Sequence, residues 1–273
     1  MPRILPVETL EHPGLAPYAH LTNPQLRSRL NPGEGLFIAE SLPVIGCALD
    51  TGCEPVSFLM QENHLRGKAA PLVASLPEDL PVYTGSAELL EKLTGYRLSR
   101  GVLAAFRRPK PRQVEELLPG CARVAVLENV VDDANLGAIF RSAAALGIGA
   151  VLLSPSCCDP LTRRALRVSM GNILRLPWAR FEGTWPEDGL SLLKRYGYQT
   201  AALALVDPAI GVEDPRLKEA PRLALLLGTE GDGLAKETIA ACDYRVYIPM
   251  ANGVDSLNVA ACAAIAFWEL TRK

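Results

Sequence analysis

Two short apolar runs near the carboxy terminus each break into a polar, glycine-rich loop. They are LALLLGTEGDGL at Leu223–Leu234 and VYIPMANGVDSLN at Val246–Asn258. A longer apolar run at Leu257–Lys273 predicts a closing helix, for which Ser256 is the expected N-cap. Because open α/β sheets bind ligands outside the carboxyl ends of their strands, we expect these two loops to form a small-ligand site.

From Cys121 onward, strand-length apolar runs alternate with helical patterns. Strands are expected at 124–127, 150–153, 200–205, 223–227 and 245–248, and helices at 136–146, 161–170 and 187–196. Strands that are apolar throughout, instead of alternating with polar residues, are typical of a parallel sheet covered on both faces. The pattern therefore predicts an α/β fold for this part of the chain.

The amino-terminal part predicts a smaller α/β domain over residues 1–107. Residues 1–20 carry four prolines and are expected to be irregular. Strands are expected at 35–40, 55–60, 81–83 and 101–107, and helices at 23–31, 41–51 and 86–93. The segment RRPKPRQ at Arg107–Gln113 has the composition of a linker. The predicted organisation is a domain over 1–107, a linker over 108–119 and a second domain over 120–273.

The composition is typical of a globular protein. The chain of 273 residues is 49% hydrophobic and 21% charged, and no apolar run reaches membrane-spanning length. Its seven cysteines are scattered without a CxxC pair, and its three histidines show no ligand spacing. A disulfide framework or a metal site is therefore not expected, and the predicted location is the cytoplasm.

Positive charge is concentrated in two places, although the net charge is −2. Neither stretch contains an acidic residue. The first comprises Arg97, Arg100, Arg107, Arg108, Lys110 and Arg112, and the second comprises Arg163, Arg164, Arg167, Arg175 and Arg180. Either run alone is equally compatible with a solvated face or a linker, but two in one chain favour a polyanionic partner.

The loops lack the standard nucleotide-binding motifs. Neither GxGxxG after a strand nor GxxxxGK[ST] is present. In GTEGDG, Gly228 would allow the backbone to approach a flat ligand, and Glu230 could accept hydrogen bonds from ribose hydroxyls. Taken alone, this segment also fits an ordinary strand-to-helix turn.

A third polar segment follows the first strand of the carboxy-terminal domain. In NVVDDANLGAIFRSAAALG, Asn135 begins a helix and Arg141 follows it on an apolar, alanine-rich background. An arginine on the buried side of such a helix needs an anionic partner. That partner could be a phosphate, bound through bidentate geometry, or a nearby acidic side chain.

Three segments together resemble the SPOUT superfamily, specifically its SpoU/TrmH-type RNA 2′-O-ribose methyltransferases. They are DANLGAIFRSA at Asp133–Ala143, LLLGTEGDGL at Leu225–Leu234 and IPMANGVDSLNVAAC at Ile248–Cys262. RVSMGNILRLPW at Arg167–Trp178 is similar to the family segment between the first two motifs, and residues 1–107 resemble its RNA-binding domain more loosely. Thr229 and Ala134 depart from the family pattern, which often has Asn and Pro there.

The resemblance implies S-adenosylmethionine as methyl donor, a carboxy-terminal trefoil knot, a ribosomal or transfer RNA substrate and a homodimer with active sites near the knot. Cofactor contacts are implied for Leu203, Gly228, Ile248, Met250 and Leu257. Active-site roles are implied for Asn135, Arg141, Glu230, Ser256 and Asn258. No metal is required by this chemistry.

Arg141 has the central implied role, either as general base or as the group that binds the phosphate beside the 2′-hydroxyl. A free arginine has a pKa above about 12, so phosphate binding is the favoured interpretation. Alternative functions are a base-nitrogen methyltransferase on the same fold and a catalytically silent RNA-binding protein; a nucleotide-dependent oxidoreductase is disfavoured because its glycine pattern is missing. Asn135, Arg141 and the intact polar positions of all three motifs favour ribose methylation.

The closing helix is apolar over a broad arc. Ala260, Ala263, Ala264 and Phe267 contribute to this arc. A helix that covers one edge of a monomer rarely needs so much apolar surface. The pattern favours burial in a dimer interface, with a fully internal core helix as the alternative.

Overall fold

The computed structural model describes residues 2–18, 35–94, 101–253 and 256–272. The chain forms two compact units, Met1–Lys110 with Leu161–Leu174, and Pro111–Pro160 with Arg175–Lys273. Both units are α/β, as the sequence predicts. The helix expected at 23–31 lies outside the described residues.

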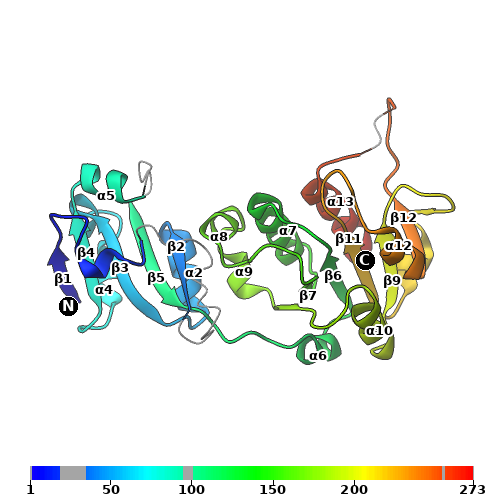
Figure 1. The fold of residues 1–273 in the computed structure, drawn as a ribbon, viewed down its shortest axis with the longest axis horizontal. Coiled ribbons are helices and arrows are strands. Elements are labelled where there is room, and N and C mark those ends of the chain that lie inside the picture. Colours follow the sequence, from blue (N-terminus) through cyan, green and yellow to red (C-terminus); the bar gives the residue numbers. More distant parts are fainter. Residues whose placement is uncertain (1, 19–34, 95–100, 254–255, 273) are drawn as a thin grey trace. The chain divides into compact units, whose positions relative to one another are not determined.

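The first unit is built on a five-stranded mixed sheet in the order β1-β4-β3-β5-β2 (Figure 1). The strand β5 pairs antiparallel with β2 and β3, while β4 pairs parallel with β1 and β3. The strands are β1 (Arg3–Pro6), β2 (Leu36–Glu40), β3 (Pro55–Gln61), β4 (Pro81–Gly85) and β5 (Val102–Arg107). The helices are η1 (Pro13–Leu15), α2 (Leu42–Asp50), α3 (Glu62–Leu65), α4 (Ala70–Ser75) and α5 (Ala87–Thr94).

The strand β1 corrects the expectation that residues 1–20 are irregular. It lies at the edge of the sheet and pairs only with β4 among the described strands. Proline lacks a backbone N–H, and an edge strand tolerates that loss because one of its sides faces no partner strand. The prolines of this stretch therefore did not exclude a strand.

The first unit also includes a segment that is distant in sequence, Leu161–Leu174. It contains α8 (Arg163–Val168) and most of α9 (Asn172–Arg175), and α8 packs against β2. Arg163 and Arg167 form ion pairs with the buried Glu40, at 3.8 and 3.6 Å. The predicted second domain, residues 120–273, includes this segment, whereas in the structure it packs with the first unit.

The second unit contains a seven-stranded sheet in which all pairings are parallel, in the order β10-β12-β9-β11-β6-β7-β8. Its strands are β6 (Arg123–Leu127), β7 (Ala150–Leu153), β8 (Trp178–Arg180), β9 (Gln199–Leu203), β10 (Ile210–Gly211), β11 (Leu223–Leu227) and β12 (Tyr244–Tyr247). Its helices are α6 (Val114–Leu117), η3 (Leu118–Gly120), α7 (Asp133–Ala145), α10 (Glu187–Arg195), α11 (Pro215–Glu219), α12 (Lys236–Ala241) and α13 (Val259–Thr271).

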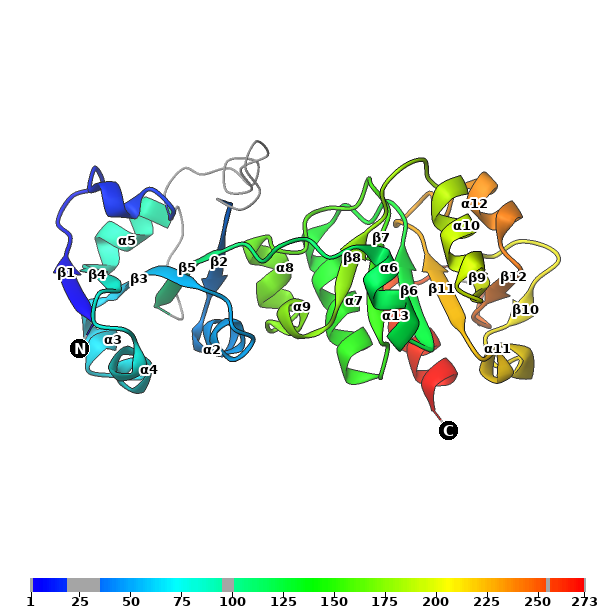
Figure 2. The same ribbon diagram turned by 90° about the horizontal axis from the view of Figure 1, so that it is seen from below.

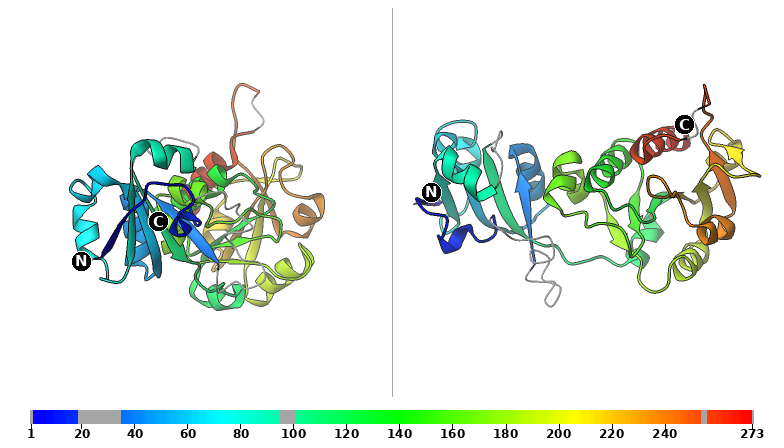
Figure 3. Two further views of the ribbon diagram at one scale, coloured as in Figure 1. Left: turned by 60° about the vertical axis from the view of Figure 1, so that its left-hand side comes forward. Right: turned by 45° about the horizontal axis from the view of Figure 1, so that its top comes forward.

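Helices cover both faces of this sheet. Figures 1 and 2 show α7 and α13 on one face and α6 and α10 on the other. Figure 3 shows the closing helix α13 beside α7, and the two helices pack closely. The central strand β11 is buried along its whole length, which explains why its sequence is apolar without alternation. Among the described residues, no helix is long and apolar enough to cross a membrane.

The helix α13 differs from expectation in its start and in its packing. It begins at Val259 and is capped by Asn258, not by Ser256. Ala263 and Phe267 are fully buried within the protomer, so these two residues belong to an internal core. The large apolar side chains that this helix exposes are instead Ile265 and Trp268.

Candidate active site

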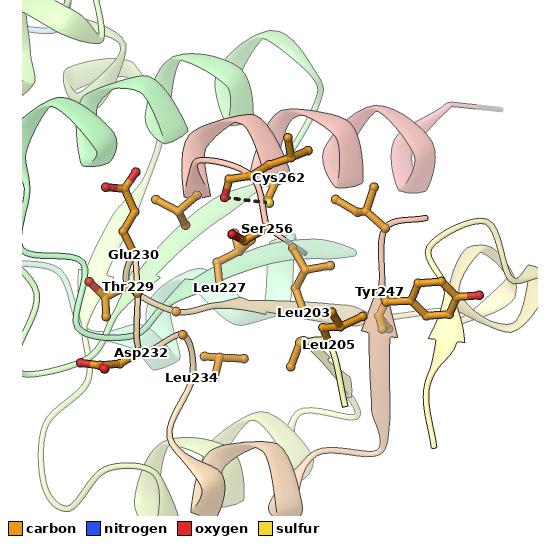
Figure 4. Close-up of a pocket in the computed structure, with 18 of the residues that line it drawn as sticks. Leu203, Leu205, Leu227, Thr229, Glu230, Asp232, Leu234, Tyr247, Ser256 and Cys262 are labelled. Atoms are coloured by element: carbon orange, nitrogen blue, oxygen red, sulfur yellow. Dashed lines mark hydrogen bonds between the residues drawn. The ribbon is translucent and has the colours of Figure 1, made fainter. Parts of the chain in front are cut away.

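A pocket of about 670 Å³ lies at the carboxyl edge of the parallel sheet in the second unit. Its walls are the loops that follow β9, β11 and β12 and the first turns of α13 (Figure 4). Parallel strands bring all their carboxyl ends to one edge, so loops distant in sequence meet there. This is the place where the glycine-rich loops predict a ligand site.

The five residues expected to contact a cofactor all line this pocket. They are Leu203, Gly228, Ile248, Met250 and Leu257. Gly228 and Ile248 are buried, Leu203 and Met250 are half-buried, and Leu257 is exposed. The structure therefore brings together, in one cavity, positions that three separate segments supply.

Gly228 is needed for a different reason from the one expected. A side chain here would collide first with the backbone of Gly233 and Leu234. The loop folds back on itself, with the Gly233 N–H donating to the Thr229 carbonyl oxygen at 3.2 Å. The glycine thus permits the loop to close, whereas the sequence predicts that it leaves space for the ligand.

Asn258 joins the polar residues at the mouth of the pocket. Its Oδ1 accepts hydrogen bonds from the N–H groups of Ala260 and Ala261, at 2.9 and 3.3 Å, and caps α13. That contact orients the amide, so its Nδ2 is the donor. Nδ2 donates to Asn135 Oδ1 at 3.0 Å and to Glu230 Oε1. One side chain therefore fixes residues from all three sequence motifs.

Asn135 is held from two sides. Its backbone N–H donates to the carboxylate of Asp132, the N-cap of α7, at 2.9 Å. Its side-chain oxygen is occupied by Asn258. The Asn135 side-chain amide is consequently oriented with its N–H groups directed away from Asn258, where they can donate to a bound oxygen.

The charged groups that line the pocket are all acidic. Glu230 and Asp232 belong to the glycine-rich loop, and no lysine, arginine or histidine is among the described lining residues. Most of the remaining lining is apolar. An apolar cavity with carboxylates at its rim suits a ligand that combines a hydrophobic body with positive charge.

Arg141 does not behave as the sequence suggests. It lies on α7 but is exposed, so the argument from an arginine on the buried side of this helix is wrong. It also forms no hydrogen bond or ion pair with the described residues, which removes the alternative of a structural salt bridge to them. Arg141 does not line the pocket. Its guanidinium is therefore free to bind an external anion.

Ser256 and Cys262 complete the polar lining. Ser256 is exposed at the pocket wall, as expected for a site residue, although it does not cap α13. Burial raises the pKa of the Cys262 thiol, whose Sγ donates to the Leu257 carbonyl oxygen at 3.6 Å (Figure 4). A protonated thiol is a poor nucleophile, so this side chain does not favour covalent catalysis.

Some pocket residues were missed from sequence. Leu205 and Val206 line the cavity and are exposed, because β9 ends at Leu203 and not at Leu205. Glu128 was also missed; it is buried behind the glycine-rich loop and binds Ala235 and Thr238. Its signal was a single acidic residue directly after an apolar strand.

The arginines of the second basic run bind partners within the protein. Arg180 donates to the carbonyl oxygens of Ser154, Pro155, Cys157 and Cys158, and thereby holds the loop after β7. The other four arginines of the run also have partners. This run therefore supports an anionic partner less than its sequence suggested.

The sequence and the fold match known RNA methyltransferases. Residues 122–268 match the model of the SpoU rRNA Methylase family. An uncharacterized tRNA/rRNA methyltransferase of Mycobacterium bovis is 39% identical over 268 residues, covering 96% of this chain and 90% of the relative. The 23S rRNA (guanosine-2′-O-)-methyltransferase RlmB of Acinetobacter baylyi is 31% identical over 204 residues, covering 72% of this chain and 80% of that protein.

Solved structures agree with this assignment. The AdoMet-bound rRNA methyltransferase from Sinorhizobium meliloti has a TM-score of 0.81 at 25% identity, covering 98% of this chain and 97% of that one. A structure described as an RNA 2′-O ribose methyltransferase has a TM-score of 0.79 at 26% identity, covering 97% and 98%. On these matches, this chain belongs to the SpoU rRNA Methylase family.

Proposed function

We propose that this protein transfers a methyl group from S-adenosylmethionine to a ribose 2′-hydroxyl of ribosomal or transfer RNA. The observation that carries the proposal is the hydrogen-bonded set Asn135–Asn258–Glu230 at the mouth of the pocket. The names of the relatives support both the donor and the ribose acceptor, since one relative methylates a guanosine 2′-oxygen and one structure contains AdoMet.

The pocket fits this methyl donor. Its volume of about 670 Å³ is within the range of small-molecule sites, roughly 300–1,000 Å³. Apolar walls suit the adenosine, and the carboxylates of Glu230 and Asp232 suit the positively charged sulfonium and ammonium groups. We assign Leu203, Gly228, Ile248, Met250 and Leu257 to cofactor binding. The bound cofactor supplies an electrophilic methyl group.

The ribose 2′-hydroxyl is a weak nucleophile, and residues of this chain have to orient it toward the methyl group. Placing the reacting atoms in line contributes up to ~7–11 kcal/mol in favourable cases. We assign this task to the side-chain N–H groups of Asn135, which Asn258 holds in place while Glu230 fixes Asn258 in turn. Ser256 is assigned to the same polar site from its position in the lining.

Arg141 is assigned to the RNA phosphate beside the reacting ribose. An exposed guanidinium without a partner among the described residues can form two parallel hydrogen bonds with a phosphate. Holding that phosphate would orient the neighbouring 2′-hydroxyl toward the methyl donor.

The division of labour between the domains belongs to the same proposal. Residues 1–107 form the RNA-binding domain, 108–119 the linker and 120–273 the methyltransferase domain with its trefoil knot. We place the enzyme in the cytoplasm.

Lys110 and Arg112 of the first basic run are expected to bind RNA, whereas Arg107 forms an ion pair with Glu54. Lys110 and Arg112 are exposed and form no ion pair with the described residues. Replacing both with alanine should weaken RNA affinity and lower the slope of log affinity against log salt by about two, since each phosphate contact contributes about one. Filter binding across a salt series measures both. The matched control is Lys194→Ala with Arg195→Ala on α10, which removes equal charge and should change neither value.

The exposed part of α13 is expected to form a homodimer interface. Trp268 is 57% exposed and Ile265 is 39% exposed, and they lie three residues apart on the same side of the helix. Replacing both with aspartate should convert a dimer to a monomer at micromolar concentration, because charges would be buried unpaired. Light scattering measures the mass, with Trp268→Phe as a control that should stay dimeric. A monomeric wild-type protein would reject this interface.

The reaction can be tested in cells. Mapping 2′-O-methylation across total RNA with and without this gene should reveal at least one ribose methyl group that depends on it. A lost methyl group on a base nitrogen would favour the alternative reaction on this fold. No lost modification would favour a silent RNA-binding protein.

A further inference from the structure

Glu128 lies at the junction between two of the sequence motifs. It directly follows β6, and its backbone N–H donates to the carbonyl oxygen of Leu227 at 2.8 Å. Leu227 is the last residue of β11, immediately before Gly228 and the glycine-rich loop. Glu128 is only 5% exposed although it is acidic. A carboxylate buried at this point needs strong hydrogen-bond donors.

Three donors from two distant segments meet this carboxylate. Oε1 accepts a hydrogen bond from the backbone N–H of Ala235 at 2.6 Å. Oε2 accepts one from Trp185 Nε1 at 2.6 Å and another from the hydroxyl of Thr238. The Ala235 and Thr238 contacts bind the residues that directly follow the glycine-rich loop, and the Trp185 contact braces the carboxylate from the segment before α10.

The segment that Glu128 holds forms one wall of the pocket. Leu234, the neighbour of Ala235, lines the cavity, and so does Ile239 in α12. Between Gly228 and Leu234 the loop is joined to itself by the Gly233–Thr229 hydrogen bond. Gly231 and Gly233 adopt positive φ angles of 88° and 68°, and glycine loses more conformational freedom on folding than other residues, so contacts outside the loop are needed to hold it in one conformation. The far end of the loop is fixed by contacts outside it, and Glu128 accepts two of these hydrogen bonds, from Ala235 and Thr238.

We propose that Glu128 is a positioning residue that shapes the methyl-donor pocket by fixing the far end of its glycine-rich loop. The inference rests on the proposed function, because it identifies what holds the cofactor loop in its binding conformation. Glu128 does not line the pocket, so it acts through the loop and not by contact with the donor. Its loss should therefore weaken donor binding more than it slows the chemical step.

The isosteric variant Glu128→Gln tests this role. It keeps the size of the side chain but places an NH₂ group where the carboxylate accepted hydrogen bonds. Donor–donor repulsion should free the loop and raise the Kd for S-adenosylmethionine and for S-adenosylhomocysteine by roughly tenfold. Turnover at saturating donor should stay within about twofold of wild type, since no group at the reacting atoms has changed.

Asp243→Asn is the matched control. Asp243 accepts hydrogen bonds from the N–H and hydroxyl groups of Thr200, at 2.8 and 2.9 Å, next to the start of β9. This is the opposite edge of the same sheet from the pocket. The control should lower the unfolding midpoint without changing the Kd for either ligand. A purely structural role for Glu128 would give this same pattern.

Calorimetric titration of the 273-residue protein with S-adenosylmethionine and S-adenosylhomocysteine tests the role of Glu128. A folded Glu128→Gln variant with wild-type Kd would overturn the inference, as would an equal rise in Kd for Asp243→Asn. If Glu128→Gln fails to fold, Thr238→Val and Trp185→Phe each remove one donor and should raise the Kd about threefold. Unchanged values in both would also overturn it. A wild-type protein that does not bind S-adenosylmethionine would reject the proposed function instead.

Discussion

Arg141→Ala is expected to lower turnover at saturating RNA by about 10²–10³-fold, which is the usual cost of losing one preorganised group at a reacting centre. The Kd for S-adenosylmethionine should be unchanged, because Arg141 does not line the pocket. The fold should also be unaffected, since the side chain is exposed and bonds to none of the described residues. Few substitutions combine so large an effect on rate with so small an expected effect on stability.

Single-turnover methyl transfer and calorimetry measure these two quantities separately. Arg141→Lys is the informative control, because it keeps the positive charge but cannot form the two parallel hydrogen bonds with a phosphate. Its turnover should fall between those of wild type and Arg141→Ala. If Arg141→Ala turns over at the wild-type rate, the assignment of Arg141 to the active site is wrong.

Gly228→Val is expected to abolish measurable donor binding. The new side chain would meet the backbone of Gly233 and Leu234, so the loop could not fold back as it does now. Backbone cannot move aside as a flexible side chain can, and the pocket wall built from this loop would open. The parallel sheet should persist, because the collision affects only the loop beyond β11.

Calorimetric titration with circular dichroism as a check on folding tests this expectation. Gly120→Val serves as the control, since a Cβ at Gly120 meets no atom within 4 Å. It should bind the donor as the wild type does. Unchanged donor binding by a folded Gly228→Val protein would mean that the loop does not form the pocket.

The central strands could be predicted because burial on both faces leaves them no polar positions. The run LALLL became the fully buried β11, and the loop after it lines the pocket as expected. Asn135 and Asn258 could be assigned to one site only through family resemblance, since no periodicity connects them, whereas the glycine-rich loop itself indicated Glu230. In the structure, the side chains of Asn135 and Asn258 are joined by a hydrogen bond across 123 positions of sequence.

The predictions for Glu128, Arg141 and β1 also depended on contacts between residues that are distant in sequence. Glu128 has partners 57, 107 and 110 residues away, so its position after an apolar strand marks it as unusual but cannot reveal what it binds. The exposure of Arg141 depends on which face of α7 packs against α13. The alanine-rich sequence of α7 does not indicate which face that is. The strand β1 was missed because prolines generally disfavour strands. They are tolerated at the edge of a sheet, and the edge position of β1 becomes visible only once the sheet is assembled.

The most direct test of ribose methylation is the chemical position of the transferred methyl group. The purified protein would be incubated with S-adenosylmethionine labelled in its methyl group and with RNA that lacks native modifications. The RNA would then be digested to nucleosides and the labelled product identified by mass spectrometry. Label in a 2′-O-methylnucleoside is the predicted result. Label on a base, or no label under conditions where the donor binds, would contradict methylation of a ribose 2′-hydroxyl.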